Sequence, residues 1–299
     1  MKLTGIIPPV VTPFDKEGNL DIKALQKFLG QLEPHVDGFL VLGSNSETPY
    51  LEEAERDQVI SAAREVIPKS KPMLVGTGAE STRATVQRSQ VAQNLHADAL
   101  LVLAPFYNRA SMTPSILEKH FRTVADAVDV PVYIYNIPQV TGITHSSQWL
   151  ANIAPHPNIA GMKDSSGDIM TLTETLRLVP PTFNALTGNA PTLLPALSVG
   201  AQGAILAVAN VAPEACKAVI RAFGKGQLEQ ARALQYRLNP LAYAVTRDYG
   251  IAGLKAVARA RGFSVGYPRA PLQDVNLEDV KKLEVMLAEL LPQQEVVAR

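Results

Sequence analysis

The chain has 299 residues, of which 46% are hydrophobic and 19% are charged, a composition typical of a globular protein with ample apolar material for a core. Disordered and fibrous classes are thereby excluded. The 28 basic and 28 acidic side chains give a formal net charge of zero, so the positive surplus expected of proteins that bind nucleic acid or anionic membranes is absent. We expect neither kind of partner.

The cysteine count and the terminal sequence bear on the compartment. Cys216 is the only cysteine, which excludes an intrachain disulfide and a cysteine-rich metal site. Residues 1–9 contain one basic residue and an apolar stretch that is too short and too rich in proline for a signal peptide. No apolar run reaches the ~18 residues of a transmembrane helix. These features predict a cytoplasmic protein.

Short apolar segments alternate with amphipathic stretches up to about residue 224, a pattern typical of βα units around a parallel sheet. Eight segments are predicted strands, at residues 5–11, 38–42, 73–75, 99–103, 132–136, 159–163, 183–187 and 204–207. Between them, residues 51–66 form a predicted helix with acids in its first turn and Pro68 just beyond its end. Ser81 and the pair Thr113-Pro114 signal the starts of two further helices.

After residue 224 the strand signals cease, and helical periodicity covers residues 228–245, 253–261 and 277–290. The pattern therefore predicts a (β/α)8 TIM barrel in residues 1–224 and a C-terminal helical region in residues 225–299. A doubly wound open sheet is the alternative. In either architecture, catalytic side chains gather at the carboxyl ends of the strands.

Two reactive side chains end neighbouring predicted strands. Lys163 closes an apolar segment, where loss of water would favour the neutral amine, a nucleophile toward ketones. Alternatively, its stem packs on the barrel rim and its charge reaches solvent beside Asp164. Tyr135 is a candidate proton carrier next to that amine, although a tyrosine at a strand end is also a common core residue. The pair favours covalent catalysis by lysine more than either residue does alone, and the two structural alternatives stay open.

Other motifs supply binding groups or exclude cofactors. Ser44 and Asn45, in a small-residue loop after the second strand, offer hydroxyl and N–H groups that suit a carboxylate, or they belong to an ordinary βα turn. Residues 76–78 (GTG) lack the third glycine of a dinucleotide site. The 5 histidines show no HxH or HxxxH spacing for a metal. Lysine catalysis requires no metal, and we expect no cofactor.

The same places carry the motifs of a known family. These motifs occur in order at residues 7–14 (IPPVVTPF), 43–47 (GSNSE), 76–78 (GTG), 105–108 (PFYN), 135–138 (YNIP), 141–142 (TG) and 161–165 (GMKDS). On these grounds the sequence resembles the dihydrodipicolinate synthase / N-acetylneuraminate lyase superfamily over essentially its whole length. The resemblance implies a (β/α)8 barrel and a pyruvate-dependent class I (Schiff-base) aldolase or lyase, assembled as a homotetramer or homodimer.

The resemblance also implies roles for individual residues. Lys163 matches the Schiff-base lysine, Tyr135 the catalytic tyrosine and Ser44 the hydroxyl of a proton relay. Tyr107 matches a tyrosine that crosses the dimer interface and completes the neighbouring site. Phe106 stands where many members carry a second tyrosine.

Substrate-binding roles follow from the same resemblance. Ser44 and Asn45 match a pair that binds the keto-acid carboxylate, and Ser165 and Gly188 match pocket positions.

The aldehyde half of the substrate is harder to assign. Dihydrodipicolinate synthases usually have an arginine two residues before the Thr-Gly pair, but Gln139 occupies that position and cannot bind a carboxylate as a bidentate cation. Residues 43–45, 156–165, 244–255 and 269–272 instead resemble 4-hydroxy-2-oxoglutarate aldolase.

We therefore predict retro-aldol cleavage of 4-hydroxy-2-oxoglutarate to pyruvate and glyoxylate. The alternatives are dihydrodipicolinate synthase, another pyruvate-dependent sugar-acid lyase, and a non-catalytic sensor of 2-keto acids.

Overall fold

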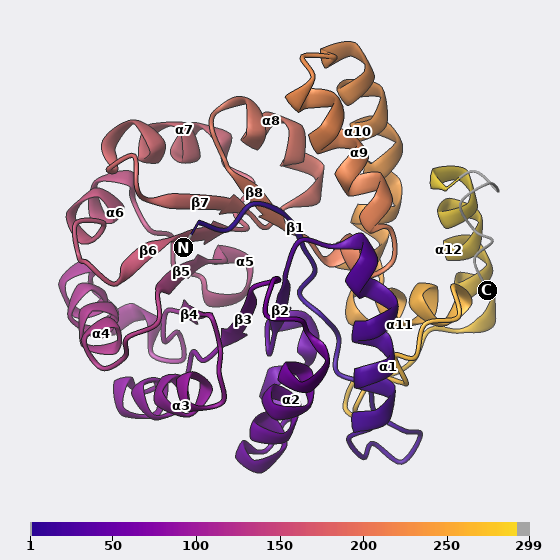
Figure 1. The fold of residues 1–299 in the computed structure, drawn as a ribbon, viewed down its shortest axis with the longest axis horizontal. Coiled ribbons are helices and arrows are strands. Elements are labelled where there is room, and N and C mark those ends of the chain that lie inside the picture. Colours follow the sequence, from indigo (N-terminus) through magenta and orange to yellow (C-terminus); the bar gives the residue numbers. More distant parts are fainter. Residues whose placement is uncertain (1, 292–299) are drawn as a thin grey trace.

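Eight parallel strands form a barrel in the computed structural model, which describes residues 2–291 (Figure 1). The strands are β1 (Gly5–Ile7), β2 (Phe39–Val41), β3 (Met73–Gly76), β4 (Ala99–Leu103), β5 (Val132–Asn136), β6 (Ile159–Asp164), β7 (Asn184–Thr187) and β8 (Gly203–Ile205). Their order is β1-β8-β7-β6-β5-β4-β3-β2. The two end strands meet just beyond β1, where the Leu40 N–H donates to the Pro8 carbonyl over 3.0 Å. The predicted (β/α)8 barrel is confirmed, and the open sheet is excluded.

Helices follow the strands, and all of those in residues 2–224 except the short α5 cover the outside of the barrel (Figure 1). They are α1 (Ile22–Leu32), α2 (Glu53–Val66), α3 (Thr82–Asn94), α4 (Pro114–Asp126), the short α5 (Pro138–Thr141), α6 (Ser147–Ile153), α7 (Ile169–Leu178), α8 (Leu193–Ser198) and α9 (Pro213–Gly224). The predicted start signals are confirmed: the Ser81 side chain accepts from the Ala84 N–H over 3.1 Å, and Thr113 caps α4 in the same way.

The C-terminal region is helical as predicted, with α10 (Leu228–Tyr243), α11 (Gly250–Ala260) and α12 (Leu277–Leu290) on one side of the barrel (Figure 1). The predicted helix 228–245 is wrong at its end. Residues Ala244–Asp248 form a π-helix, in which the Tyr249 N–H donates to the Ala244 carbonyl over 2.9 Å. The apolar spacing carries no sign of the extra residue that a π-turn inserts. The domain boundary after residue 224 stays a prediction.

Other boundary predictions also differ from the structure. The first strand was expected to reach residue 11 but ends at Ile7, since Pro8 and Pro9 have no N–H to donate to a ladder. The helix expected from residue 51 begins at Glu53, because Thr48–Tyr50 form a separate 3-10 turn that includes Pro49. Among residues 2–291, no helix is long and apolar enough to cross a membrane.

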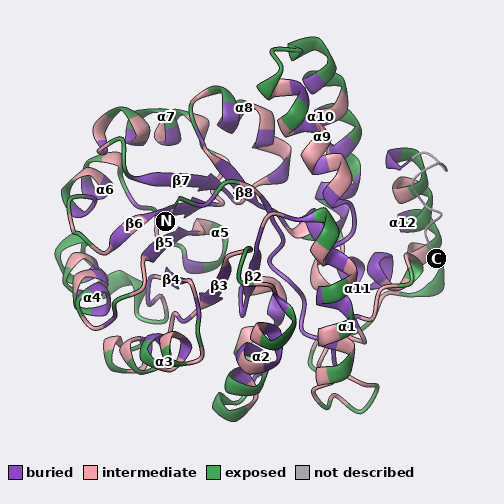
Figure 2. Ribbon diagram, in the orientation of Figure 1, coloured by how far each residue is buried: buried purple, intermediate pink, exposed green. Residues whose placement is uncertain are grey.

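The strands are buried on both faces, whereas the helices expose their outer sides (Figure 2). Inside the barrel, Leu40, Leu74, Leu101, Tyr133 and Leu186 belong to one packed cluster. Side chains two residues apart on a strand share a face, so Tyr135 points inward like Tyr133. This alternation brings polar side chains at the strand ends over the filled interior.

Candidate active site

Lys163 and Tyr135 lie opposite each other on adjacent strands, β6 and β5. The Lys163 Nζ donates to the Tyr135 hydroxyl over 3.1 Å and lies 4.1 Å from the centroid of the tyrosine ring. Only 3% of Lys163 and 5% of Tyr135 are exposed. The pairing follows from the parallel register, which brings the last inward-facing position of each strand to the same height.

The alternative of a rim lysine paired with Asp164 is excluded. The Asp164 carboxylate accepts from the Asn136 side chain over 2.7 Å and from the Ser166 hydroxyl over 2.9 Å. Neighbouring residues on a strand face opposite sides, so Asp164 points away from Lys163. Burial raises the pKa of Asp164, and its hydrogen bonds hold the end of β6 in place.

The Tyr135 hydroxyl lies in an environment that stabilises its anion. Burial by itself would raise the pKa of Tyr135, but the positive charge of Lys163 and hydrogen bonds from Ser44, Lys163 and Ser165 bring it below its ordinary value. A phenol in this state releases and recovers a proton more readily than one in water. The arrangement suits a proton carrier beside an amine.

The loop after β2 brings Ser44 and Asn45 to this pair. Its ends, Leu42 (φ 54°) and Glu47 (φ 57°), both have a left-handed backbone, which non-glycine residues adopt at an energetic cost and which clusters at functional sites. The Ser46 hydroxyl ties the loop to the Val10 carbonyl over 2.6 Å. Within residues 2–291 the buried Asn45 Nδ2 has no hydrogen-bond partner. It is a free donor for an anionic ligand.

Gly188 and Ser165 complete the surroundings of the lysine. A Cβ at Gly188 would lie 2.0 Å from the Ser165 Oγ and 2.8 Å from the Lys163 Cε, so only glycine leaves room for both side chains. The Ser165 N–H donates to the Asn136 carbonyl over 2.8 Å, which joins the ends of β6 and β5. These close contacts restrict the path of the lysine side chain.

A cavity of about 460 Å³ opens at the carboxyl ends of the strands. Six of the predicted residues line it: Ser44, Asn45, Tyr135, Lys163, Ser165 and Gly188. Tyr107 does not; it is 84% exposed, and its backbone N–H donates to the Glu80 carboxylate over 2.8 Å. Within a single chain, the structure therefore brings together every predicted site residue except Tyr107.

The cavity also contains residues to which sequence reasoning assigned no role. Tyr243, Thr246 and Arg247 reach it from the end of α10 and the π-helix. Asn189 lines it as well, and its buried Oδ1 has no hydrogen-bond partner among the described residues. In the sequence, residues 244–247 carried only a resemblance to 4-hydroxy-2-oxoglutarate aldolase, with no role for any side chain. No local pattern indicated that a C-terminal segment returns to the barrel mouth.

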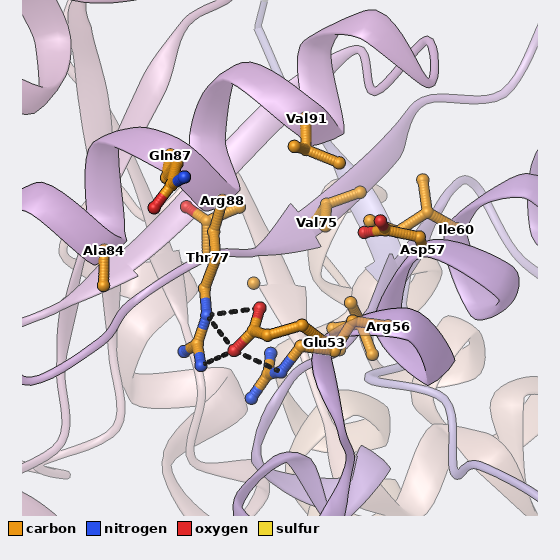
Figure 3. Close-up of a pocket in the computed structure, with 12 residues that line it drawn as sticks. Glu53, Arg56, Asp57, Ile60, Val75, Thr77, Ala84, Gln87, Arg88 and Val91 are labelled. Carbon is orange, nitrogen blue, oxygen red and sulfur yellow. Dashed lines mark hydrogen bonds and ion pairs between the residues drawn. The ribbon is translucent and has the colours of Figure 1, made fainter.

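A second cavity, of about 300 Å³, lies between α2 and α3 (Figure 3). Three of its charged side chains pair with one another, since Glu53 contacts both Arg88 and Arg56. Burial, with the nearby charge of Arg88, lowers the pKa of Arg56 to about 10, and its Nη2 donates to the Thr48 carbonyl over 2.7 Å. None of the predicted site residues lines this cavity.

A buried lysine amine beside a tyrosine hydroxyl, at the carboxyl end of an eight-stranded barrel, defines a class of enzymes that use lysine as a nucleophile. The dihydrodipicolinate synthetase family matches residues 2–290, so the chain belongs to that family. The superfamily resemblance of the motifs is confirmed. Members are pyruvate-dependent Schiff-base aldolases, and this protein is accordingly an enzyme, a lyase of that type.

Individual relatives are similar over nearly the whole chain. An uncharacterised DapA-like lyase of Halobacterium salinarum is 38% identical, with 96% of this chain and 94% of that protein covered. The 4-hydroxy-tetrahydrodipicolinate synthase of Archaeoglobus fulgidus is 32% identical, with coverages of 96% and 98%. The crystal structure of YagE from E. coli, in complex with pyruvate, is 30% identical, covers 96% of this chain and 98% of its own, and superimposes with a TM-score of 0.89.

Proposed function

We propose that the protein cleaves 4-hydroxy-2-oxoglutarate to pyruvate and glyoxylate through a Schiff base on Lys163. The observation that carries the proposal is the 3.1 Å hydrogen bond between the Lys163 Nζ and the Tyr135 hydroxyl inside the cavity. The pyruvate complex of the related YagE supports a pyruvate half-site. Membership of a lyase family supports the reaction class.

The chemistry follows from the two groups. The Tyr135 phenolate takes a proton from Lys163, and the amine so formed attacks the C2 carbonyl carbon. Tyr135 then gives this proton to the departing oxygen, so that water leaves and an iminium forms. The Tyr135 phenolate then takes the proton of the C4 hydroxyl, the C3–C4 bond breaks, and its electron pair moves into the iminium as glyoxylate departs. The enamine takes that proton back from Tyr135 at C3, and water hydrolyses the iminium to release pyruvate and the free lysine.

Polar groups in the cavity match the rest of this substrate. The unpartnered Asn45 Nδ2, together with the Ser44 hydroxyl, would donate to the C1 carboxylate. The unpartnered Asn189 Oδ1 would accept from the C4 hydroxyl. An Oδ1 acceptor at this position favours a keto acid with a hydroxyl group at C4 over one without it, because a buried acceptor that lacks a hydrogen-bond partner costs free energy.

A second candidate is 4-hydroxy-tetrahydrodipicolinate synthase, the activity named for relatives such as the one from Archaeoglobus fulgidus. Gln139 argues against it. This side chain is neutral, and its Nε2 donates to the Ser165 and Ser166 carbonyls over 3.0 and 3.2 Å, so it offers no cation to a carboxylate. Parallel assays of pyruvate with glyoxylate and with aspartate semialdehyde separate the two activities.

The covalent step is tested by treating the enzyme with pyruvate and borohydride. We expect a mass increase on Lys163, identified by peptide mass spectrometry, and none in Lys163→Ala. The matched control is Lys282→Ala, an exposed lysine of α12 outside the cavity, which should retain the adduct. An unmodified Lys163, together with turnover that survives Lys163→Ala, would refute the mechanism.

We also propose that the active assembly contains at least two chains, as a homodimer or homotetramer. The 84% exposure of Tyr107 supports this, since a tyrosine free of its own cavity is available to a neighbouring one. A cytoplasmic location is part of the same proposal.

A further inference from the structure

The charges around the active-site cavity are unevenly distributed. Among the described residues that line it, Lys163 and Arg247 are the two basic side chains, and none is acidic. Lys163 is buried, whereas the side chain of Arg247 is 68% exposed and lies on the solvent side. The cavity therefore has a buried cation, Lys163, which is the proposed nucleophile, and a second cation, Arg247, near its opening.

The guanidinium of Arg247 has two contacts that orient it, and these contacts leave part of its hydrogen-bonding capacity free. It lies 4.7 Å from the centroid of the Tyr243 ring, a stacking contact that limits its orientations. Its Nε donates to the Asp248 carboxylate over 2.8 Å. This hydrogen bond uses one edge of the guanidinium and leaves the two terminal nitrogens available, a geometry suited to a planar carboxylate.

The backbone explains why Arg247 faces the cavity. Arg247 lies within the π-helix Ala244–Asp248, where one extra residue per turn changes the direction of the side chains that follow. Single π-turns occur frequently at functional sites. Thr246 and Val245 of the same turn also line the cavity.

We propose that Arg247 is a specificity-determining residue that binds a second carboxylate, the one carried by the aldehyde half of the substrate. The inference rests on the proposed function and deepens it, because it assigns the distal carboxylate of 4-hydroxy-2-oxoglutarate to one side chain. The loop of Ser44 and Asn45 binds the carboxylate beside the ketone. Arg247 binds the distal one, and Gln139 cannot, because its amide is engaged by the Ser165 and Ser166 carbonyls.

The test compares two substrates that differ only at the distal group. The native enzyme, Arg247→Gln and Arg247→Lys are assayed for cleavage of 4-hydroxy-2-oxoglutarate and of 4-hydroxy-2-oxopentanoate, in which a methyl group replaces the distal carboxylate. We expect Arg247→Gln to lower kcat/KM for the dicarboxylate by about 10- to 100-fold, mainly through KM, the loss typical of a charge-assisted hydrogen bond. The monocarboxylate should be cleaved at the native rate, and Arg247→Lys should recover part of the loss.

Two controls keep the conclusion specific. Arg232→Gln removes another exposed arginine of the C-terminal region, which pairs with Glu229 and lies outside the cavity. It should leave kcat/KM for both substrates unchanged. Borohydride trapping with pyruvate alone should give the native yield of adduct in Arg247→Gln, because pyruvate lacks the distal group.

The outcomes distinguish the role of Arg247 from the proposed lyase activity. Equal losses for both substrates, no loss for either, or a native preference for the monocarboxylate overturns the role of Arg247 while the pyruvate adduct still forms. A native enzyme that forms no adduct with pyruvate overturns the proposed function itself, and the role of Arg247 with it.

Discussion

The amine of Lys163 and the hydroxyl of Tyr135 depend on each other for their chemistry. The charge of Lys163 counteracts the effect of burial on the phenol, and the phenol is the hydrogen-bond partner of the amine. A buried phenol on its own holds its proton tightly, so the charge of Lys163 makes Tyr135 more acidic than burial alone would leave it.

Tyr135→Phe isolates this dependence, since it keeps the ring and removes the oxygen. We expect kcat to fall by roughly 10²–10⁴-fold, the usual contribution of a positioned acid-base group. Steady-state cleavage of 4-hydroxy-2-oxoglutarate measures it, and Tyr236→Phe, at a 66% exposed position on α10, is the matched control. Retention of near-native kcat in Tyr135→Phe would mean that another group moves the proton.

Gly188 predicts a second effect at the same scale. Gly188→Ala places a methyl group 2.8 Å from the Lys163 Cε and 2.0 Å from the Ser165 Oγ, so the lysine must shift. We expect a loss of at least about 10²-fold in the rate of borohydride trapping, because displacement of a reacting group by an ångström costs that much. Gly30→Ala, on the open surface of α1, is the control and should retain activity. A native rate of borohydride trapping in Gly188→Ala would show that a methyl group at this position does not displace Lys163.

A buried ion pair joins the active-site loop to helix α11. The Lys255 Nζ lies 2.5 Å from the Glu47 Oε1, and neither side chain is exposed. Lys255 also donates to the Tyr267 carbonyl over 2.7 Å, while Glu47 accepts from the Arg269 N–H over 2.8 Å. Burial lowers the pKa of Lys255 to about 8 even though Glu47 opposes the shift. Through this pair, the C-terminal region holds the end of the Ser44 loop.

Lys255→Met tests how far the two elements depend on this contact. It leaves the Glu47 carboxylate buried without its partner, so we expect the free energy of unfolding to fall by roughly 3–5 kcal/mol in urea titrations. Glu47→Gln combined with Lys255→Met should regain much of that loss, since no buried charge remains. Lys282→Met, an exposed lysine of α12, should change stability little. Equal stability of Lys255→Met and the native chain would show that the pair is dispensable.

Acid stability is a property of the whole molecule. His120 and His145 pack around Phe121 and Trp149, and burial lowers the pKa of each histidine to about 4. The unfolded chain binds protons at these groups below about pH 6.5, and the folded chain does so only near pH 4.

Stability should therefore decrease as the pH falls from 6.5 to 4, by roughly 3 kcal/mol for each histidine. Urea titrations across that range, with His145→Phe, measure the contribution of one group, and the variant should lose stability less steeply than the native chain. His35→Gln, at a 44% exposed side chain, serves as control. An unchanged slope in His145→Phe would place the acid sensitivity elsewhere.

Assembly is tested by mixing two inactive variants, Lys163→Ala and Tyr107→Phe, after dissociation and reassociation. If Tyr107 completes the neighbouring cavity, mixed dimers contain one site with neither substitution, and activity should return. If native mass spectrometry shows mixed assemblies but activity does not return, Tyr107 does not complete the neighbouring cavity.

The amino-acid sequence by itself determined the alternation of strands and helices, because apolar periodicity and capping residues are local signals. It also identified Lys163 and Tyr135, since the ends of neighbouring parallel strands must meet at one edge of the barrel. Their roles, like those of Ser44, Asn45, Ser165, Gly188 and Tyr107, stay predictions.

Only the tertiary structure decided that the π-helix returns Arg247 to the cavity and that Lys255 neutralises Glu47. These contacts join segments far apart in the chain. They depend on how the C-terminal helices pack against the barrel, which no local pattern specifies.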